Sequence, residues 1–381
     1  MGEGPRRSAE RARELHVRSI VVDTLSGGPS LFTDRMTERA KRVLEEGKSG
    51  IEAVVAAEQE MVRELAEDAG CREHYRRMWD EGGVTCASLT LGGLGSPPFS
   101  FRSGLESLAR TTRVLDACDD WLAKVTRAEQ VRLAHDAGKH GLILNFQNTT
   151  HFGLDLDRLD LFYDFGVRII QLTYNQRNFV GDGCTERTDA GLSHFGVELV
   201  RRLNRMGVLV DLSHSGSATA WDAIRVSEKP VAFTHTFCRA LSEHDRGKPD
   251  ELLRAVAETG GYIGMVTVPF FISSEPQPTL KDVVRHVRHA VEVAGIDHVG
   301  IGTDWGAVYP RELADALNRE MGLIGFRAEH RVDWNATMPD YRSWQDWPGI
   351  TASLLEDGFT KEEVQKLLGL NFLRVFEQTV G

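Results

Sequence analysis

The segment GVLVDLSHSG, residues 207–216, decides which fold we expect for this chain. Gly207 ends an amphipathic stretch (192–207), and glycine at that place is the usual end of a helix. The apolar run that follows is continuous rather than alternating, which is typical of a parallel strand covered on both faces. It ends at Ser213 and His214. The segment therefore predicts a buried strand that carries a histidine at its carboxyl end.

Similar apolar runs recur along the chain and predict further buried strands. They lie at 20–23, 84–90, 142–147, 168–172, 231–234, 262–268 and 299–302, and with 208–212 they make eight. Helical patterns separate them, for example at 51–70 and 157–166. Eight strands alternating with helices predict an α/β fold of the (β/α)8 TIM-barrel type. A doubly wound open sheet is the alternative, but no GxGxxG follows the first strand to favour it.

The domain organisation is expected to be simple. No Pro-, Ser- or Gly-rich linker divides the 381 residues, so we predict one domain, 1–381. The segment at about 305–350 follows the eighth strand and is rich in Trp, Arg and Asp. A connection of this length is expected to be a rim insertion, either a functional lid or a contact between copies of the chain.

Composition argues against several classes of partner. The 45 basic and 56 acidic residues give a net charge of −11, and no dense basic run follows the first dozen residues, so we expect no nucleic acid. No uncharged apolar segment reaches membrane-spanning length, and the first twenty residues lack the apolar core of a signal peptide. The five scattered cysteines suit a reducing compartment, so the predicted location is cytoplasmic.

Polar residues gather where the predicted strands end, which is where a TIM barrel carries its chemistry. These positions are Thr24, Leu25, Gln147, Asn148, Tyr174, Asn175, Ser213, His214, His235 and Asp304. Neutral imidazoles and a carboxylate are ligands for Zn²⁺ or a similar divalent ion. A single histidine at a strand end is more often an ordinary buried residue. Two on consecutive strands, together with Asp304, predict a shared metal or catalytic site.

Longer motifs at the same strands carry a resemblance to a known family. They are DLDRLDLFYDFGVRIIQLTYN, GLSHFGVELVRRLNRMGVLVDLSHSG, KPVAFTHT, RGKPDELLRAV and VGIGTDWG. In order and spacing the chain resembles the membrane (renal) dipeptidases, the M19 metallopeptidases of the amidohydrolase superfamily. The resemblance is strongest from about Leu142 to Gly306 and fainter elsewhere, although the closing GFTKEEVQKLLGLNFLRVF is also similar.

The resemblance implies a ligand set. Family members hold two zinc ions, one of which would be bound here by His214 and His235. The other ion uses a His-x-Asp after the first strand and an aspartate after the eighth, here Asp304, while a glutamate after the third strand bridges both. Arg246 matches the arginine that grips the carboxylate of the substrate, and a guanidinium offers two parallel donors for that task.

The chain departs from the family pattern at the ligands themselves. Leu25 and Gly27 stand where the His-x-Asp would be, Gln147 stands at the bridging glutamate, and Tyr174 replaces a substrate-binding histidine. Side chains of Leu and Gly cannot ligate a cation, and a neutral amide does not supply the bridging charge. We therefore expect one zinc ion per chain, either weakly held or absent, with His214, His235 and Asp304 as its candidate ligands.

Other candidates lie at the rim. Tyr174, Asn175 and Gln147 are predicted substrate-binding residues. The loop NQRNFVGDGCTERTDAG carries Glu186, which either restores the missing charge near a substrate or is an exposed loop acid. Cys184 on the same loop is a nucleophile, a ligand or an inert thiol. His286 and His289, spaced along a helical pattern, are expected on a solvated face.

Three functions remain open from the sequence. The leading one is a metal-dependent hydrolase that acts on a dipeptide or another amino-acid-derived small molecule, with Asp304 as acid and base. The second is elimination, isomerisation or tautomerisation in a biosynthetic pathway, with Tyr174 and Asp304 as proton carriers. The third is a catalytically silent binding protein. A homodimer is compatible with each.

Overall fold

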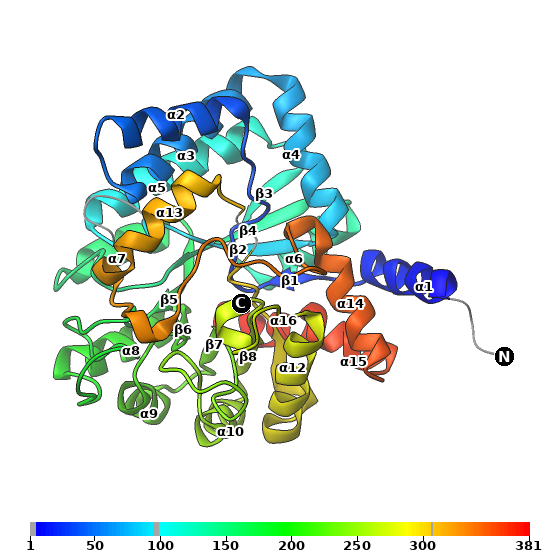
Figure 1. Ribbon diagram of the computed structural model, residues 1–381. Helices are drawn as coiled ribbons and strands as arrows, with labels where there is room; N and C mark the ends of the chain where they lie inside the picture. Colours follow the sequence, from blue (N-terminus) through cyan, green and yellow to red (C-terminus); the bar gives the residue numbers. More distant parts are fainter. Residues whose placement is uncertain (1–4, 94–98, 306–307) are drawn as a thin grey trace.

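A parallel β-barrel forms the centre of the molecule (Figure 1). The computed structural model describes residues 5–93, 99–305 and 308–381. Eight parallel strands follow one another around the sheet in the order β1-β2-β4-β5-β6-β7-β8-β9. Their bounds are Val22–Asp23, Cys86–Thr90, His140–Phe146, Val167–Gln171, Leu209–Asp211, Ala232–Thr236, Tyr262–Met265 and Val299–Ile301. Each predicted apolar run overlaps one of these strands, so the (β/α)8 barrel prediction is confirmed.

The first and last strands are joined, which excludes the open-sheet alternative. The amide of Thr24 donates to the carbonyl of Ile301 at 3.3 Å, and the amide of Asp304 donates to the carbonyl of Leu25 at 2.8 Å. The carboxylate of Asp23 adds a side-chain link, because it accepts from both the amide (2.9 Å) and the hydroxyl (2.6 Å) of Thr303. The ends of β1 and β9 are thereby held together at the mouth of the barrel.

A ninth strand, β3 (Leu122–Val125), lies off this path and escaped the sequence analysis. It pairs with the first half of β4, from His140 to Ile143, while β5 pairs with the second half of β4 from Leu144 onward. The run LAKV is short, and its two middle residues are exposed, so it lacks the continuous apolar character that marks the other strands.

Helices surround the barrel and connect its strands. They are α1 Pro5–Arg18, α2 Asp34–Glu45, α3 Gly50–Glu67, α4 Ala69–Gly82, α5 Phe101–Ala117, α6 Ala128–Asp136, α7 Leu156–Asp164, α8 His194–Met206, α9 Ser217–Val226, α10 Asp250–Glu258, α11 Pro269–Ile272, α12 Leu280–Ala294, α13 Arg311–Glu320, α14 Trp347–Glu356, α15 Lys361–Gln365 and α16 Asn371–Thr379. The predicted helical stretches 51–70, 157–166 and 192–207 correspond to α3, α7 and α8.

The two ends of the barrel differ in how they are covered. At the amino ends of the strands, Phe372 and Phe376 of α16 pack into one buried cluster with residues such as Val22, Ile143 and Tyr262. This cluster fills the barrel interior and closes that end. Helices α2, α3, α5 and α13 gather into a separate group beside the first strands, as Figure 1 shows, and α3 contacts each of the other three. The carboxyl ends of the strands lie between these two parts.

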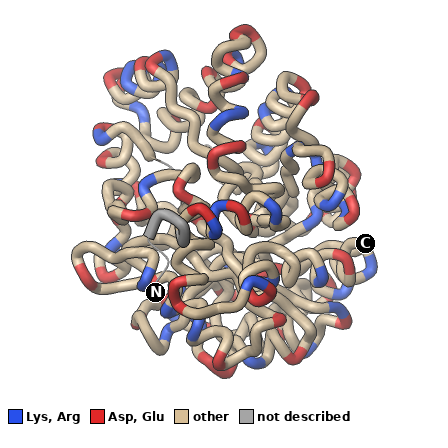
Figure 2. The backbone as a smooth tube through the Cα atoms, turned by 90° about the vertical axis from the view of Figure 1, so that its right-hand side faces the viewer, with Lys and Arg blue, Asp and Glu red and all other residues tan. Residues whose placement is uncertain are grey.

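The segment at about 305–350 consists of α13 and three short 3-10 turns, Met321–Ile324, Ala328–His330 and Trp344–Asp346. Helix α13 packs on α3, and Trp344 and Trp347 are fully buried. The indole of Trp347 donates to Asp23 at 3.1 Å. On the face of the molecule that Figure 2 turns to the viewer, acidic and basic residues are interspersed. Within the described ranges, no helix is both long and apolar enough to cross a membrane.

Candidate active site at the barrel mouth

Two buried histidines meet at the carboxyl ends of β6 and β7. His214 lies three residues past β6, and His235 is the fourth residue of β7. Their side chains are almost completely enclosed, and their Nε2 atoms lie 3.0 Å apart. The two histidines therefore lie side by side, as expected from their positions at consecutive strand ends.

Hydrogen bonds on the outer side of each ring decide where the ring protons lie. The Nδ1 atom of His214 is 2.7 Å from the carbonyl oxygen of the Asn175 amide, which can only accept, so Nδ1 carries the proton. The Nδ1 atom of His235 is 2.8 Å from the Thr234 hydroxyl, which itself donates to the Asp211 carboxylate at 2.6 Å. Because the Thr234 hydroxyl gives its proton to Asp211, the Nδ1 atom of His235 carries a proton and donates it to the Thr234 oxygen.

With both Nδ1 atoms protonated, two Nε2 lone pairs face each other. Burial, followed by the charge of nearby Arg246, lowers the pKa of both histidines well below 6.5, so the imidazoles are neutral. Two facing lone pairs repel each other unless a proton or a cation lies between them. Ring nitrogens that share one tetrahedral zinc ion lie about 3.3 Å apart, close to the separation found here. The pair thus fits two ligands of a single metal ion.

A second metal position does not fit. Leu25 is a buried apolar side chain, and Gly27 offers no side chain at all. Gln147 donates through Nε2 to the Thr90 hydroxyl at 2.8 Å, and its Oε1 has no partner among the described residues. In the described part of the chain, no three His, Cys, Asp or Glu side chains gather to hold an ion. Asp304 therefore does not join the two histidines in a three-residue ligand set.

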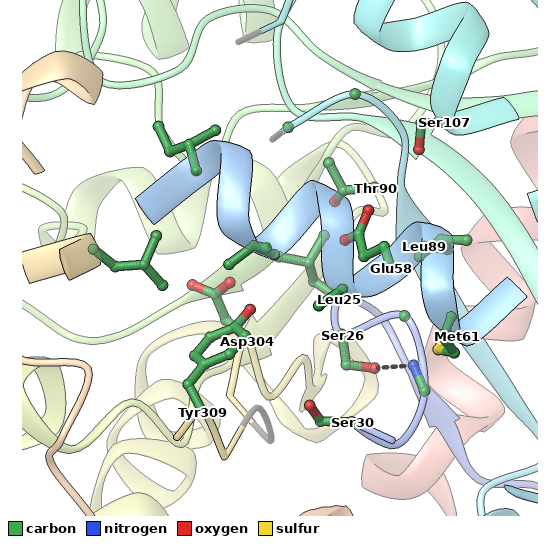
Figure 3. Close-up of a pocket in the computed structure, with 18 of the residues that line it drawn as sticks. Leu25, Ser26, Ser30, Glu58, Met61, Leu89, Thr90, Ser107, Asp304 and Tyr309 are labelled. Atoms are coloured by element: carbon green, nitrogen blue, oxygen red, sulfur yellow. Dashed lines mark hydrogen bonds between the residues drawn. The ribbon is translucent and has the colours of Figure 1, made fainter. Parts of the chain in front are cut away.

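A pocket of about 360 Å³ opens at the mouth of the barrel (Figure 3). Three of the predicted site residues line it, namely Gln147, Tyr174 and Asp304. Its remaining wall comes from the 25–32 loop, the end of β2, helices α3 and α5, and the 305–334 segment. A pocket of this volume lies within the range of about 300–1,000 Å³ that small-molecule sites occupy.

Asp304 is a titratable acid that lines this pocket. Its backbone adopts a left-handed conformation with φ of 52°, which is uncommon for a residue other than glycine. Burial raises its pKa to about 7; the charge of Arg246 opposes this, and the nearby carboxylates Asp23 and Asp211 add to it. A carboxyl group with such a pKa can both accept and donate a proton near neutral pH.

Tyr174 presents a ring and a protonated hydroxyl to the same pocket. Its ring stacks on His214 with centroids 4.1 Å apart and an interplanar angle of 21°, and Phe99 contacts its ring at 4.7 Å. Burial raises the pKa of the Tyr174 phenol, and the charge of Asp304 raises it further. The hydroxyl therefore stays protonated and acts as a hydrogen-bond donor.

Two cations lie beneath the histidines rather than in the pocket. Arg246 is fully buried and donates to the carbonyls of Ser213 (2.5 Å) and His235 (3.1 Å), so its fork is occupied by the backbone. It is not among the residues that line the pocket. Lys248 donates to the carbonyl of Ser215, and burial lowers its pKa to about 7. Lys248 was missed because nothing in RGKPD marks its side chain as buried.

Comparisons with known proteins agree with this architecture. The sequence profile of the membrane dipeptidases (peptidase family M19) matches residues 9–321. The chain belongs to the membrane dipeptidase family. It is 27% identical over 282 residues to dipeptidase tcpJ of Claviceps purpurea (73% of this chain) and 29% identical over 294 residues to the uncharacterized dipeptidase C965.12 of Schizosaccharomyces pombe (74% of this chain). It spans only 60% and 64% of their lengths.

Solved structures share the whole fold. An amidohydrolase from Pseudomonas aeruginosa aligns with a TM-score of 0.76 and 27% identity over 97% of this chain and 99% of that one. The probable dipeptidase PvdM of the same organism gives 0.75 and 19% over 98% and 99%. A metallopeptidase of Rhodobacter sphaeroides, liganded with a phosphinate mimic of L-Ala-D-Ala, gives 0.67 and 21% over 84% and 96%. The family prediction is confirmed.

The other predicted rim residues of this membrane dipeptidase family member do not line the pocket. Asn175 is fully buried. Its Oδ1 accepts a hydrogen bond from Nδ1 of His214, and its Nδ2 donates to the Ile324 carbonyl at 2.8 Å. Glu186 accepts from the amides of Arg177 and Arg187, which lower its pKa, and it does not line the pocket. Burial raises the pKa of the Cys184 thiol, which therefore stays protonated.

One further acid of this dipeptidase-family barrel was missed from the sequence. Asp23 is fully buried at the end of β1, where it accepts from Thr303, Trp347 and the amide of Leu25. Burial raises its pKa to about 6, although these donors oppose the rise. The signal was available, because the predicted strand IVVD ends on this carboxylate.

Proposed function

We propose that this chain is a dipeptidase-like hydrolase that acts on a dipeptide or an amino-acid-derived small molecule, with one zinc ion per chain held by His214 and His235. The observation that carries this proposal is the pair of neutral imidazoles whose Nε2 lone pairs face each other at 3.0 Å. Asn175 and Thr234 hold the two rings in that orientation from behind. Family membership supports the reaction class.

The pocket residues supply the remaining chemistry. A zinc ion held by His214 and His235, which are not among the residues that line the pocket, would polarise a carbonyl group and lower the pKa of water. Asp304, with a pKa of about 7, is suited to take a proton from the attacking water and to return it to the leaving amine. Tyr174 offers a protonated hydroxyl to the substrate. Arg246 is assigned to holding the ends of β6 and β7.

The test combines zinc content with peptide turnover. Protein purified without chelator is expected to contain about one zinc per chain and to hydrolyse members of a panel of L,L- and L,D-dipeptides. His214→Ala and His235→Ala are each expected to lose both, while Glu67→Gln, an exposed change on α3, keeps both. Full turnover in both histidine variants would overturn the proposal.

A second candidate has its own support. Tyr174 and Asp304 both line the pocket and influence each other's charge state, whereas the second metal position lacks its ligands. A protonated phenol in the same pocket as a carboxyl group of pKa about 7 suits proton transfer at carbon, as in elimination, isomerisation or tautomerisation of an amino-acid derivative. Solvent deuterium incorporation at the substrate Cα without peptide cleavage, lost in both Tyr174→Phe and Asp304→Asn, would favour this reaction.

We further propose that the protein works in the cytoplasm as one domain and without nucleic acid. The five cysteines are all free thiols, which supports a reducing compartment. A homodimer is part of the same proposal, with the rim segment at about 305–350 as a candidate contact. Light scattering after size-exclusion chromatography measures the oligomeric state, and a monomer at all concentrations would refute the dimer.

A further inference from the structure

The pocket extends well beyond the predicted catalytic residues, toward α3 and α5. Its wall in this direction is largely apolar and includes Met36, Ile51, Val54, Met61, Leu89 and Leu317. Among the described residues that line the pocket, the ionisable side chains of Asp, Glu, Lys and Arg are Asp304, Glu58 and Arg110. Figure 3 shows Glu58 near Leu25, Leu89 and Thr90, and it shows Asp304 beside Tyr309 in another part of the pocket. Glu58 is therefore a second acidic residue in the pocket wall, separate from Asp304.

Glu58 is only partly neutralised. Its Oε2 lies 3.2 Å from an Nη2 atom of Arg110 on α5, and in the described part of the chain its Oε1 accepts no hydrogen bond. The side chain of Glu58 is 38% exposed, whereas that of Arg110 is 14% exposed, so the carboxylate faces the pocket more than the guanidinium does. Burial raises the pKa of Glu58, with Arg110 opposing, which means that the anion is poorly solvated and gains from a further donor.

Aromatic rings line another part of the pocket, where Figure 3 shows Tyr309 beside Asp304. The Tyr309 ring meets Phe32 edge-on at 5.8 Å and Trp334 at 5.7 Å, and Trp334 stacks on Trp305 at 5.5 Å. All four line the pocket. Burial and then the charge of Glu58 raise the pKa of the Tyr309 phenol, so Tyr309 lies within electrostatic reach of that carboxylate. Aromatic faces attract organic ammonium groups.

We infer that the α3–α5 end of the pocket binds a protonated amine carried on an apolar arm of the ligand, with Glu58 as its counter-ion. The apolar wall takes the methylene chain, and Oε1 of Glu58 accepts from the ammonium group. This subsite deepens the proposed function by naming the side arm of the substrate. Recognition of the amine does not depend on the reaction at Asp304.

The test measures binding without turnover. Trp305 and Trp334 line the pocket, so quenching of intrinsic fluorescence reports its occupation. The probes are n-hexylammonium, n-hexanol and hexanoate at pH 7.5. We expect hexylammonium to bind about tenfold more tightly than hexanol, and hexanoate more weakly than both, because a charge-assisted hydrogen bond is made only by the first. Hexanoate binding as tightly as hexylammonium, or no saturable binding of hexylammonium, overturns the inference.

Variants of matched shape test the residue itself. Glu58→Gln is expected to abolish the preference for hexylammonium over hexanol, while Glu67→Gln, exposed on the last turn of the same helix, keeps it. Arg110→Gln removes the competing cation and is expected to tighten hexylammonium binding. An unchanged preference in Glu58→Gln would overturn the assignment, and the Arg110 variant decides it if Glu58→Gln does not fold. Because no peptide is cleaved in the assay, its outcome is independent of the proposed hydrolysis.

Discussion

Replacing Asp304 by Asn is expected to stabilise the protein at alkaline pH. Burial raises the pKa of Asp304 from 3.8 to about 7 in the folded state, whereas the unfolded chain keeps the ordinary value. The folded state therefore binds the proton more tightly. The contribution of Asp304 to the free energy of unfolding is fully present below about pH 4 and is lost as the pH rises through about 7. Asparagine cannot ionise, so the variant avoids this loss.

The magnitude follows from the same two values. The gap between 3.8 and about 7 corresponds at most to about 4 kcal/mol, and the partial exposure of Asp304 to the pocket reduces the expected effect to about half of that. Between pH 5 and pH 8, the advantage of Asp304→Asn over the parent protein should grow by about 1 kcal/mol, because the part of the change below pH 5 lies outside this range.

Urea unfolding followed by tryptophan fluorescence, at several pH values and with a chelator present, measures the difference between parent and variant. The chelator removes any stabilisation by bound zinc. Other buried acids, such as Asp23, contribute to both proteins and largely cancel in the comparison. A difference that stays constant from pH 5 to pH 8 would show that Asp304 is ionised throughout, and the acid–base role proposed for it would fail.

Three further outcomes are expected. Asn175→Leu leaves the Nδ1 of His214 without an acceptor and should weaken zinc binding about ten- to hundredfold in a chelator competition. Gly28→Ala, at φ of 95°, places a Cβ 2.4 Å from the Trp79 ring and should cost about 3 kcal/mol in chemical denaturation. Asp23→Ala leaves the Trp347 indole and its other donors unpaired and should cost about 3 kcal/mol in the same measurement.

The barrel was predictable because strand burial is recorded in sequence as continuous apolar runs. Each of the eight predicted runs overlaps a strand, and His214 and His235 at two of the strand ends lie beside each other. The pattern fails where burial and polarity do not match. His286 was expected on a solvated face, and this was wrong, because α12 packs against α10, α11 and α14 and buries the ring with its Nε2 on the Ile272 carbonyl.

The site was predictable only in part, because a motif identifies positions along the chain and not the direction of side chains. Gln147, Tyr174 and Asp304 lie in the pocket as expected. Arg246 occupies the expected position, yet its donors are turned to backbone carbonyls. Glu58 had no signal at all, since a carboxylate in the middle of a regular helix has the same pattern whether it faces solvent or a cavity.

The loop residues that stand where the family carries metal ligands also form part of the pocket wall. Leu25, Gly27 and Gly28 stand at or beside the expected His-x-Asp, and the same three residues line the pocket. At Gly27, where φ is 89°, a Cβ would lie 2.7 Å from the Cδ1 of Leu89, so the loop rests directly on the end of β2. An aspartate at position 27 would displace Leu89, and a histidine at position 25 would replace an apolar part of the wall. Re-creating the second metal position therefore removes the surface that the proposed amine-bearing arm contacts. Under this proposal, the residues that lack metal-binding groups also line the pocket that holds the apolar subsite.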